Sequence, residues 1–436
     1  MNRRDFLSAT STSFLAASAP ILVPAFVLGR QGSVPPSDKI TMGFIGVGGQ
    51  GSGHVRGFLQ HPDVRALAIC DVRESARLSN KRAVDAAYGD NTCAVYNDFR
   101  ELLARPDIDA VLIAVPDHWH VLIGLEAARR GKHMYYEKPL ALTLAEAKAM
   151  RAAVKRYGVV FQFGTQQRSS HYFRHACELA RSGRLGRLES ILVGSASFTP
   201  IPNQPPQPVP PGLDYDMWLG PAPWTPYCEI KCTRQFTLIY DYSLGCLSGA
   251  WGIHDIDFAQ WVNDADHTAP IEIEGAGVIP EEGIYDTPIT WEVEQRYANG
   301  VTLIHADRYT ALKREPRKFR PNMGTLVQGS EGWVWVSRQG MWSEPASLVG
   351  AVVRPDEGKV LFSNDHRRNF LDAIRFGTPL LSPIDAAFNA EVACQQADIA
   401  IRLGRKLRWD PAKEVFEGDE SANRMLSRSM RSPWHL

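Results

Sequence analysis

The sequence predicts an α/β protein of two domains, the first built on a doubly wound parallel sheet and the second on a mainly antiparallel sheet. Three observations support this fold class. Across residues 38–160, short apolar runs alternate with helical patterns, as is typical of a parallel sheet. Across residues 161–363, strand-like segments follow one another with hairpin signals between them. The chain of 436 residues is longer than one ordinary domain, and its 44% hydrophobic residues can fill a large core.

Composition also limits the partners. Lys plus Arg and Asp plus Glu each number 48, so the formal net charge is zero and the bulk charge does not favour nucleic acid. Seven Cys, an odd number, do not suggest a disulfide scaffold, although Cys228 and Cys232 could pair in an oxidising compartment. His118 and His120 are spaced like a metal pair, but no set of Asp, Glu or His partners accompanies them, so we predict no metal site.

The first 30 residues have the features of an export signal. Arg3-Arg4 begins a twin-arginine pattern, and a run of small and apolar residues extends from Phe14 to Leu28. We expect export to the periplasm, with the twin-arginine machinery as a partner. Ala17-Ser18-Ala19 has the small residues of a cleavage site, but Pro20 follows directly, so an uncleaved signal that anchors the protein stays an alternative.

The first predicted strand runs directly into a glycine-rich turn that fits G-x-G-x-x-G. Gly46 would allow the tight turn, Gly48 would let the backbone approach a pyrophosphate, and Gly51 would let the next helix pack closely. The N–H groups where that helix starts, at Gly49 and Gln50, would hold the phosphates. This pattern predicts a Rossmann-type dinucleotide site.

The second predicted strand ends in Asp71, a position that suits the ribose of the same nucleotide. A carboxylate there can accept hydrogen bonds from a 2′-hydroxyl and would repel a 2′-phosphate, which favours NAD. Arg73 keeps NADP open, because a guanidinium can pair with that phosphate. The alternative for the whole segment is a glycine loop in an unrelated α/β domain.

Later strands of the alternation also end in polar residues. Strands are predicted over residues 109–115, 133–136 and 159–163, and capping boxes that begin at Asp98 and Thr143 start two of the helices. Ligands of doubly wound sheets bind at the carboxyl ends of the strands, so one cleft could collect the residues found there. The expected cofactor contacts at these ends are Pro116, His118, His120, Glu137 and Lys138.

The second half begins differently. A strand predicted over residues 188–198 leads into a Pro-rich stretch over residues 200–211. This stretch is either a plain linker or, since aromatic residues such as Trp224 follow it, the lid or wall of a site.

Regular elements then return. Strand-like segments lie between residues 271 and 353, and Asn299-Gly300 is a strong hairpin signal within them. Residues 364–410 are predicted to be helical and to pack back against the first domain, and residues 411–436 form a tail.

Four features, in this order, resemble the Gfo/Idh/MocA family, the relatives of glucose–fructose oxidoreductase and inositol dehydrogenase. They are the glycine turn at residues 46–51, Pro116-x-x-x-His120, Glu137-Lys138-Pro139 and Gly252-Ile253-His254-Asp255-Ile256-Asp257. The resemblance covers roughly residues 38–410. It implies a Rossmann domain, a C-terminal α/β domain whose large open sheet often mediates homo-oligomers, a tightly held nicotinamide cofactor, and sugar or polyol substrates.

The resemblance also implies catalytic residues. Lys138 takes the position that hydrogen-bonds the reacting hydroxyl, and His254 takes that of the general acid/base. A lysine beside a positively charged nicotinamide in a partly dry site should have a lowered pKa, which suits proton transfer. Tyr242, near His254 in the sequence, is a further acid/base candidate. The alternatives are a surface ion pair for Lys138 and a core histidine for His254.

One position departs from the pattern of the dehydrogenase members, many of which place Asp four residues before the His. Ala250 stands there. The carboxylates that could substitute are Asp241, Asp255 and Asp257. A similar lack occurs in relatives that look like NAD-dependent glycosidases, which oxidise a ring carbon, eliminate the aglycone, add water and reduce again. Because the periplasm holds no free NAD pool, an exported enzyme of either kind must recycle its cofactor on the spot.

Weaker candidates could contact a sugar, although a structural role is the alternative for each. They are Gln166, Gln167, Arg168, Trp224, Asp241 and Asp257. Taken together, the sequence predicts an exported oxidoreductase that acts on a carbohydrate through tightly bound NAD or NADP. The alternatives are a redox-neutral glycosidase or lyase with the same cofactor and a non-catalytic sugar-binding protein on the same fold.

Overall fold

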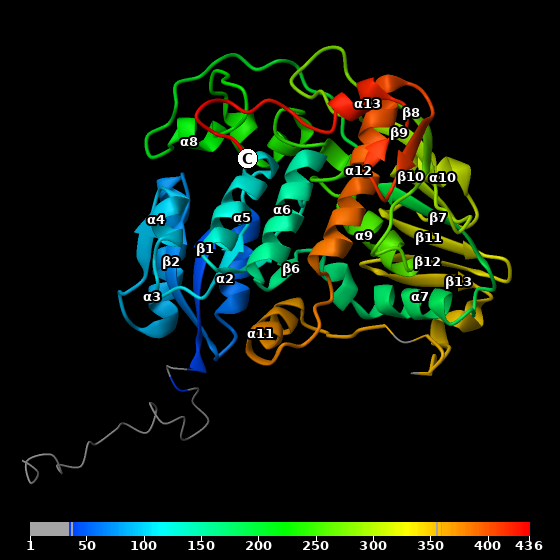
Figure 1. The fold of residues 1–436 in the computed structure, drawn as a ribbon, viewed down its shortest axis with the longest axis horizontal. Coiled ribbons are helices and arrows are strands. Elements are labelled where there is room, and N and C mark those ends of the chain that lie inside the picture. Colours follow the sequence, from blue (N-terminus) through cyan, green and yellow to red (C-terminus); the bar gives the residue numbers. More distant parts are fainter. Residues whose placement is uncertain (1–34, 36–37, 355, 359) are drawn as a thin grey trace, which may run out of the picture.

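The computed structural model describes residues 35, 38–354, 356–358 and 360–436, and two sheets dominate it (Figure 1). The twin-arginine pattern and the apolar run behind it lie outside the described residues. Within the part of the chain that the structure describes, no helix is long and apolar enough to cross a membrane. The export signal therefore stays a prediction.

The N-terminal residues form a six-stranded parallel sheet in the order β3-β2-β1-β4-β5-β6. Its strands are β1 (Ile40–Ile45), β2 (Val64–Cys70), β3 (Ala94–Tyr96), β4 (Ala110–Ile113), β5 (His133–Tyr136) and β6 (Phe161–Phe163). The chain order reverses at β1, which has β2 on one side and β4 on the other. This arrangement confirms the predicted doubly wound sheet and leaves a crevice at the carboxyl end of β1.

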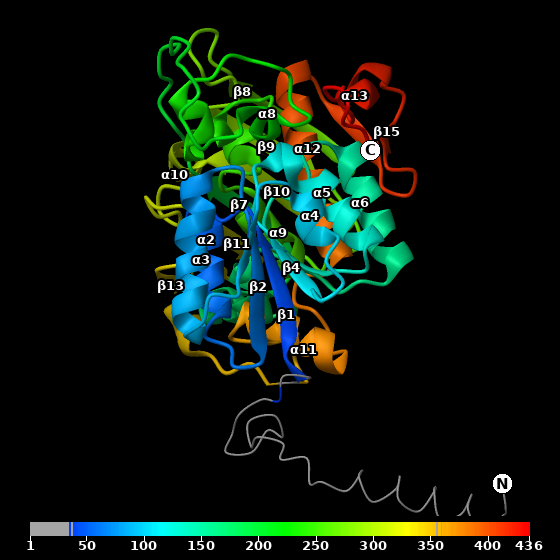
Figure 2. The same ribbon diagram turned by 90° about the vertical axis from the view of Figure 1, so that its left-hand side faces the viewer.

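Helices cover both faces of this sheet. They are α2 (Gly49–Phe58), α3 (Glu74–Tyr88), α4 (Phe99–Leu103), α5 (His120–Arg129) and α6 (Leu144–Tyr157). Figure 2 shows α2 and α3 on one side of the strands and α5 and α6 on the other. Phe44 of β1 joins the core under α2, whereas its neighbour Ile45 joins the core under α4 and α5. Burial on both faces explains why these strands have continuous apolar sequences.

Local signals set the ends of the helices. The Thr143 hydroxyl accepts a hydrogen bond from the backbone N–H of Glu146 at 3.3 Å and starts α6, which ends at Gly158 with φ of +63°. The Asp98 side chain starts α4, but it accepts from the N–H of Arg100, one residue earlier than a capping box requires.

The second half of the described chain carries a nine-stranded sheet in the order β13-β12-β11-β7-β10-β9-β8-β14-β15. Its strands are β7 (Leu188–Ser195), β8 (Glu272–Val278), β9 (Thr290–Arg296), β10 (Thr302–Asp307), β11 (Gly324–Gly329), β12 (Trp333–Ser337), β13 (Gly340–Glu344), β14 (Leu407–Asp410) and β15 (Val415–Phe416). Among the described pairs, only β7 and β10 run parallel, which confirms the mainly antiparallel sheet. Gly300, at φ of +89°, makes the predicted hairpin turn between β9 and β10.

Helices also pack on both faces of the second sheet. α7 (His171–Arg181), α9 (Ile253–Val262) and α12 (Ile384–Leu403) share one face. On the opposite face, α10 (Arg308–Arg314) closes a small core with Phe319 and Trp335. Because α12 also contacts α6, it lies between the two sheets and joins the halves of the molecule.

Residues 364–410 differ in part from the single helical segment that the sequence predicts. α11 (His366–Phe376) packs on the first domain beside β5, and α12 lies between the domains. Residues Leu407–Asp410 are not helical, because β14 adds to the second sheet beside β8. Pro379 and Pro383 stand between the helices, and neither can continue a helix because each lacks the backbone N–H.

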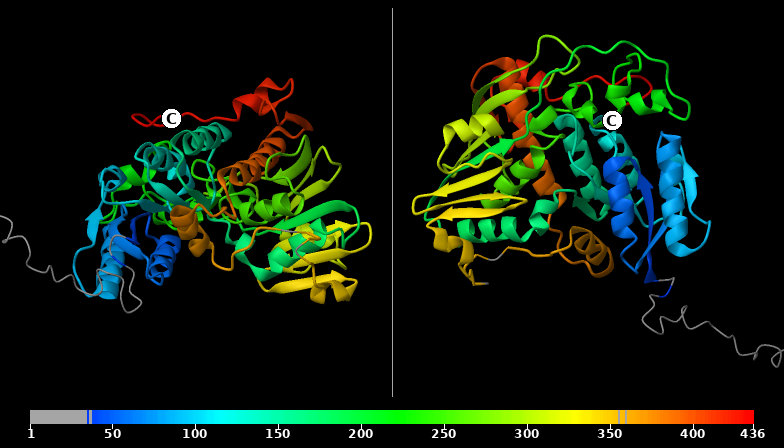
Figure 3. Two further views of the ribbon diagram at one scale, coloured as in Figure 1. Left: turned by 60° about the horizontal axis from the view of Figure 1, so that its bottom comes forward. Right: turned by 180° about the vertical axis from the view of Figure 1, so that it is seen from behind.

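The segments without long helices or strands connect the N-terminal and C-terminal halves of the molecule. Residues 200–211 contain no helix or strand, and they lead to α8 (Tyr215–Leu219) and the 3₁₀ turns η6 (Glu229–Cys232), η7 (Arg234–Leu238) and η8 (Gly245–Leu247). After α13 (Glu420–Arg424) the tail returns to the first domain (Figures 1 and 3). There the Trp434 ring packs edge-on against Trp119, with centroids 4.7 Å apart.

Candidate active site

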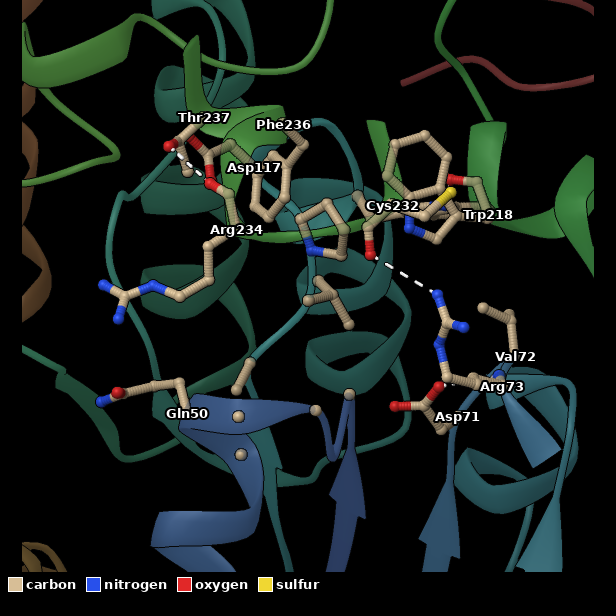
Figure 4. A pocket seen from close by; sticks show the side chains of 18 of the residues that line it. Gln50, Asp71, Val72, Arg73, Asp117, Trp218, Cys232, Arg234, Phe236 and Thr237 are labelled. Carbon is tan, nitrogen blue, oxygen red and sulfur yellow. Dashed lines mark hydrogen bonds between the residues drawn. The ribbon is translucent and has the colours of Figure 1, made fainter. Parts of the chain in front are cut away.

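A cavity of about 1100 Å³ lies at the carboxyl ends of the first sheet's central strands, between the two halves of the chain. It brings together most of the predicted cofactor contacts, which are Gly46, Gly48, Gly49, Gln50, Gly51, Asp71, Arg73, Pro116, Glu137 and Lys138. The opposite wall comes from the second half, from residues of η6 and η7. Figure 4 shows Arg234 and Phe236 of this wall facing Gln50 across the cavity.

The glycine turn has the geometry that its sequence predicts. Gly46 has φ of +78°, and a Cβ on Gly51 would lie 1.9 Å from the Gly46 carbonyl oxygen, so both positions exclude a side chain. A Cβ on Gly48 or Gly49 would meet nothing within 4 Å, which leaves the backbone bare toward the cavity. No side chain caps the start of α2 at Gly48, so its first N–H groups are available for an anion.

Asp71 lies at the end of β2 and is held from two sides. One carboxylate oxygen accepts from the N–H of Val47 at 2.8 Å, and the other accepts from the N–H of Arg73 at 2.8 Å. Burial raises the pKa of Asp71 above its ordinary value, and these two hydrogen bonds oppose that change. Each oxygen keeps a lone pair for a ribose hydroxyl. The Arg73 guanidinium instead points across the cavity and donates to the Cys232 carbonyl at 3.5 Å (Figure 4).

Lys138 follows β5 and reaches the second half of the chain. Its Nζ donates to the Gly249 carbonyl oxygen at 2.7 Å. The preceding Glu137 accepts from His54 Nε2 at 2.6 Å and from Gln50 at 3.1 Å. Burial alone would raise the pKa of Glu137, but the hydrogen bond from His54 and the charge of Lys138 hold it well below its ordinary value. Glu137 is therefore a buried carboxylate beside the lysine.

Asp117 is a functional candidate that the sequence reasoning missed. It lines the cavity, is 3% exposed, and its Oδ2 has no hydrogen-bond partner among the described residues. Burial raises its pKa to about 6, against the opposing charge of Lys138. The signal was available, because Asp117 stands between Pro116 and His118 at the end of a predicted strand.

His254 lies in the first turn of α9, beside the cavity and not among its lining residues. The side chain is 4% exposed, and its Nδ1 has no partner in the described part of the chain. Burial holds the pKa of His254 well below its ordinary value, and the charges of Arg338 and Lys138 act in the same direction. The imidazole is therefore neutral.

The structure turns three predicted site residues away from the cavity. His118 Nε2 faces the Trp218 carbonyl at 2.9 Å, and His120 Nε2 faces the Val115 carbonyl at 2.8 Å. Burial lowers the pKa of each of these histidines to about 4. Tyr242 is 1% exposed and packs against the rings of His118 and Trp218. All three side chains are buried and none lines the large cavity, although His118 lines a separate small hollow, so they pack behind the wall.

Arg168 and Asp257 are also corrected, from sugar contacts to a structural pair. The Arg168 guanidinium holds both carboxylate oxygens of Asp257 at 2.8 Å and also pairs with Asp266 at 2.7 Å. Arg168 and Asp257 are 1% and 0% exposed, so neither can reach a ligand. Gln167 is engaged as well, because it donates to Asp255 at 2.8 Å, whereas the buried Oε1 of Gln166 has no partner among the described residues.

The remaining predicted sugar contacts, Trp224 and Asp241, lie outside the large cavity. Trp224 is 67% exposed and is not among the cavity's lining residues, and Asp241 lies at a separate small hollow with Arg428. Cys228 and Cys232 are free thiols, and Cys232 lines the cavity. No group of three or more His, Cys, Asp and Glu side chains among the described residues is arranged to hold a metal ion.

Two family models match the chain. Residues 40–165 match the NAD-binding Rossmann fold of an oxidoreductase family, and residues 197–436 match the C-terminal alpha/beta domain of the same family. The second match alone covers more than half of the 436 residues.

Curated relatives match over part of the chain. The oxidoreductase YrbE of Bacillus subtilis is 30% identical over 255 residues, which are 58% of this chain and 62% of YrbE. A glycosyl hydrolase family 109 protein of Shewanella baltica is 37% identical over 164 residues, which are 34% of this chain and 35% of that protein. Each match thus spans less than two thirds of the relative's own length.

Solved structures share the fold over most of the chain. The aldose-aldose oxidoreductase of Caulobacter crescentus, complexed with glycerol, has a TM-score of 0.61 at 18% identity, over 85% of this chain and 99% of that one. The WlbA dehydrogenase of Bordetella pertussis, in complex with NADH and UDP-GlcNAcA, gives the same four values. At these identities the likeness concerns the fold.

Proposed function

The chain belongs to the Gfo/Idh/MocA oxidoreductase family, and from that premise we propose that it transfers a hydride between a carbohydrate CH–OH group and tightly bound NAD. The observation that carries the proposal is the cavity, whose walls place the glycine turn, Asp71 and Lys138 around one space. When bound, the nicotinamide supplies the hydride acceptor and donor.

The residues present fit this cofactor. The bare backbone at Gly48 and Gly49 and the uncapped start of α2 suit a pyrophosphate. The two anchored oxygens of Asp71 suit a ribose diol and would repel a 2′-phosphate. Arg73 is directed at the Cys232 carbonyl and not at the Asp71 side, which favours NAD over NADP.

Lys138, Asp117 and His254 would bind the substrate hydroxyl and transfer its proton. The ammonium of Lys138 donates one of its three N–H groups to the Gly249 carbonyl in a hydrogen bond and keeps two donors for a substrate oxygen. Asp117, whose charge acts on Lys138, has a free oxygen in the cavity wall. The neutral His254 would take up the hydroxyl proton as the hydride leaves, and it would return that proton in the reverse direction.

The wall from the second half supports a cofactor that stays bound during turnover. Residues of η6 and η7 face the glycine turn, and Arg73 joins this wall to the end of β2 through Cys232. A nucleotide held between them would have protein on both sides. Retention of this kind is what a compartment without free NAD would require.

A redox-neutral glycosidase with the same cofactor is the second candidate. Two observations favour it, the 37% identity to a glycosyl hydrolase family 109 protein and Ala250 where many dehydrogenase members have Asp. The same cavity serves both reactions, because the glycosidase route also begins with oxidation of a ring carbon.

One experiment tests the cofactor and separates the two reactions. The purified chain is denatured in acid and the released nucleotide is identified by mass spectrometry. The holoprotein is then incubated with chromogenic glycosides without added NAD, and separately reduced and treated with a keto-sugar. Aglycone release favours the glycosidase, and loss of bound NADH on addition of the keto-sugar favours hydride exchange. A protein without nucleotide would refute both.

Export to the periplasm and a homo-oligomer built through the second sheet belong to the same proposal. Cell fractionation of the full chain and of Arg4→Lys tests the export, since the twin-arginine route should fail in the variant. Light scattering of the purified protein tests the oligomer.

A further inference from the structure

Arg338 is a cation without a carboxylate partner near the candidate site. It lies in the hairpin between β12 and β13, and its guanidinium carbon is 4.5 Å from the centroid of the Trp251 indole. The side chain is exposed and makes no hydrogen bond or ion pair with any described residue. An arginine over an aromatic face keeps the N–H groups at its edge free to bind an anion.

The indole under Arg338 is fixed in place. Trp251 Nε1 donates to one oxygen of Asp255 at 2.8 Å, and the other oxygen of Asp255 accepts from Gln167 at 2.8 Å. Asp255 is fully enclosed, at 1% exposed. The Trp251 indole is therefore held in one orientation by Asp255, and this gives the guanidinium that stacks on it a defined position.

The Trp251 indole also contacts His254, the proposed general base. The Trp251 and His254 rings have centroids 5.8 Å apart, so Arg338 and His254 share one neighbour. Two buried polar atoms here have no partner in the described chain, Nδ1 of His254 and Oε1 of Gln167, whose Nε2 donates to Asp255. Unpaired buried polar atoms beside an unpaired cation indicate that a polar ligand completes this region.

The charges around Arg338 do not neutralise it directly. Although part of the side chain is exposed, the protein packed around the guanidinium lowers the pKa of Arg338 by desolvation, and the carboxylates of Asp255 and Glu137 act in the opposite direction. Neither carboxylate reaches ion-pair distance, because Asp255 is held by Trp251 and Gln167 and Glu137 by His54. The guanidinium thus keeps its full set of donors for an incoming anion.

We propose that Arg338 and Trp251 form a carboxylate subsite, and that the substrate is an acidic sugar, a uronic acid or its glycoside. This inference rests on the proposed function, since it names the substrate class of that reaction. The planar fork of a guanidinium matches a carboxylate with two parallel hydrogen bonds. Binding the acid group beside Trp251 would direct the rest of the sugar ring toward His254 and Lys138.

The test compares acidic and neutral sugars on the holoprotein. Calorimetry measures binding of the methyl glycosides of glucuronate, galacturonate and mannuronate, of their neutral counterparts glucose, galactose and mannose, and of glucose 6-sulfate. We expect at least one acid to bind about tenfold more tightly than its neutral counterpart. The advantage should shrink as salt is added, because it is electrostatic.

Two variants test whether the preference for acidic over neutral sugars depends on Arg338. Arg338→Gln should bring the ratio of acid to neutral affinity close to one. Arg156→Gln is the matched control, because Arg156 is also exposed and stacks on an aromatic ring, Tyr157, at 5.7 Å. It lies in the last turn of α6, at the edge of the first sheet opposite the cavity, so the ratio should stay as in the wild type.

Three results would overturn the inference. They are no acid preferred over its neutral counterpart, a preference that survives in Arg338→Gln, or a sulfate ester bound more tightly than every carboxylate. Nucleotide content of the same preparations separates this failure from that of the proposed function. A protein with its full nucleotide but no acid preference overturns only the subsite, whereas a protein that binds no nucleotide overturns the proposed function and the subsite with it.

Discussion

Removal of the Asp257 carboxylate should weaken the fold and leave the proposed substrate site intact. In the folded protein this carboxylate holds the Arg168 guanidinium through two hydrogen bonds of 2.8 Å, with both side chains almost fully enclosed. Breaking a buried pair by deleting one partner costs about 3–5 kcal/mol, because the other charge stays buried without compensation. Arg168 would keep Asp266 at 2.7 Å, so we expect the lower end, about 3 kcal/mol, for Asp257→Ala.

Urea unfolding followed by circular dichroism measures this change, with the free energy taken from the midpoint at unchanged slope. The matched control is Glu189→Ala, which removes the exposed partner of Arg187, a pair 3.0 Å long. Its effect should stay within about 0.5 kcal/mol, because exposed ion pairs contribute little. A sugar contact would behave in the opposite way. If Asp257→Ala unfolded like the wild type but bound substrate tenfold more weakly, the assignment of this pair to the fold would be refuted.

Three further predictions concern the site. Gly51→Ala should lose most of the bound nucleotide, because its Cβ would lie 1.9 Å from the Gly46 carbonyl oxygen, and full nucleotide content after acid release would contradict this. Burial raises the pKa of Asp117 to about 6, so kcat should fall as the pH drops through 6 and the carboxylate that faces Lys138 is neutralised. Asp117→Asn should lack this pH limb, and a profile identical to the wild type would exclude the role. Burial raises the pKa of Glu391 to about 8, so the folded state holds a proton that the unfolded chain releases, and stability is lost as pH rises toward 8. Glu391→Gln should therefore gain about 1–3 kcal/mol over the wild type between pH 6 and pH 9, and an equal difference at both pH values in thermal unfolding would contradict this.

The sequence was sufficient where function depends on short-range geometry. The glycine turn, Asp71 and Lys138 each follow a parallel strand directly, and parallel strands bring their carboxyl ends to one edge. Their meeting at one cavity therefore follows from the order of elements alone. The hairpin at Gly300 and the capping by Thr143 are local in the same sense.

The sequence was insufficient where a partner comes from far along the chain. His120 looks like a site residue at a strand end, but its ring turns toward the carbonyl of Val115. Arg168 looks free after the last strand of the first sheet, but Asp257 and Asp266 reach it from α9 and the loop behind it. Arg338 gave no signal at all, because only the packing of a distant hairpin over Trp251 brings it near the site.

The acceptor for Lys138 explains why the second half of the chain must be in place for chemistry. A carboxylate in that position would pair with the ammonium and compete with the substrate for it, whereas the neutral Gly249 carbonyl orients the ammonium and leaves two donors free. A side chain at this position would displace the Asp117 carboxylate, because a Cβ there would lie 1.9 Å from Oδ2 of Asp117. Glu391 of α12 supports the arrangement from behind, since it accepts from the N–H of Leu140 and from the hydroxyl of Ser248. One buried side chain between the two sheets thus fixes both the lysine loop and the segment that carries its acceptor.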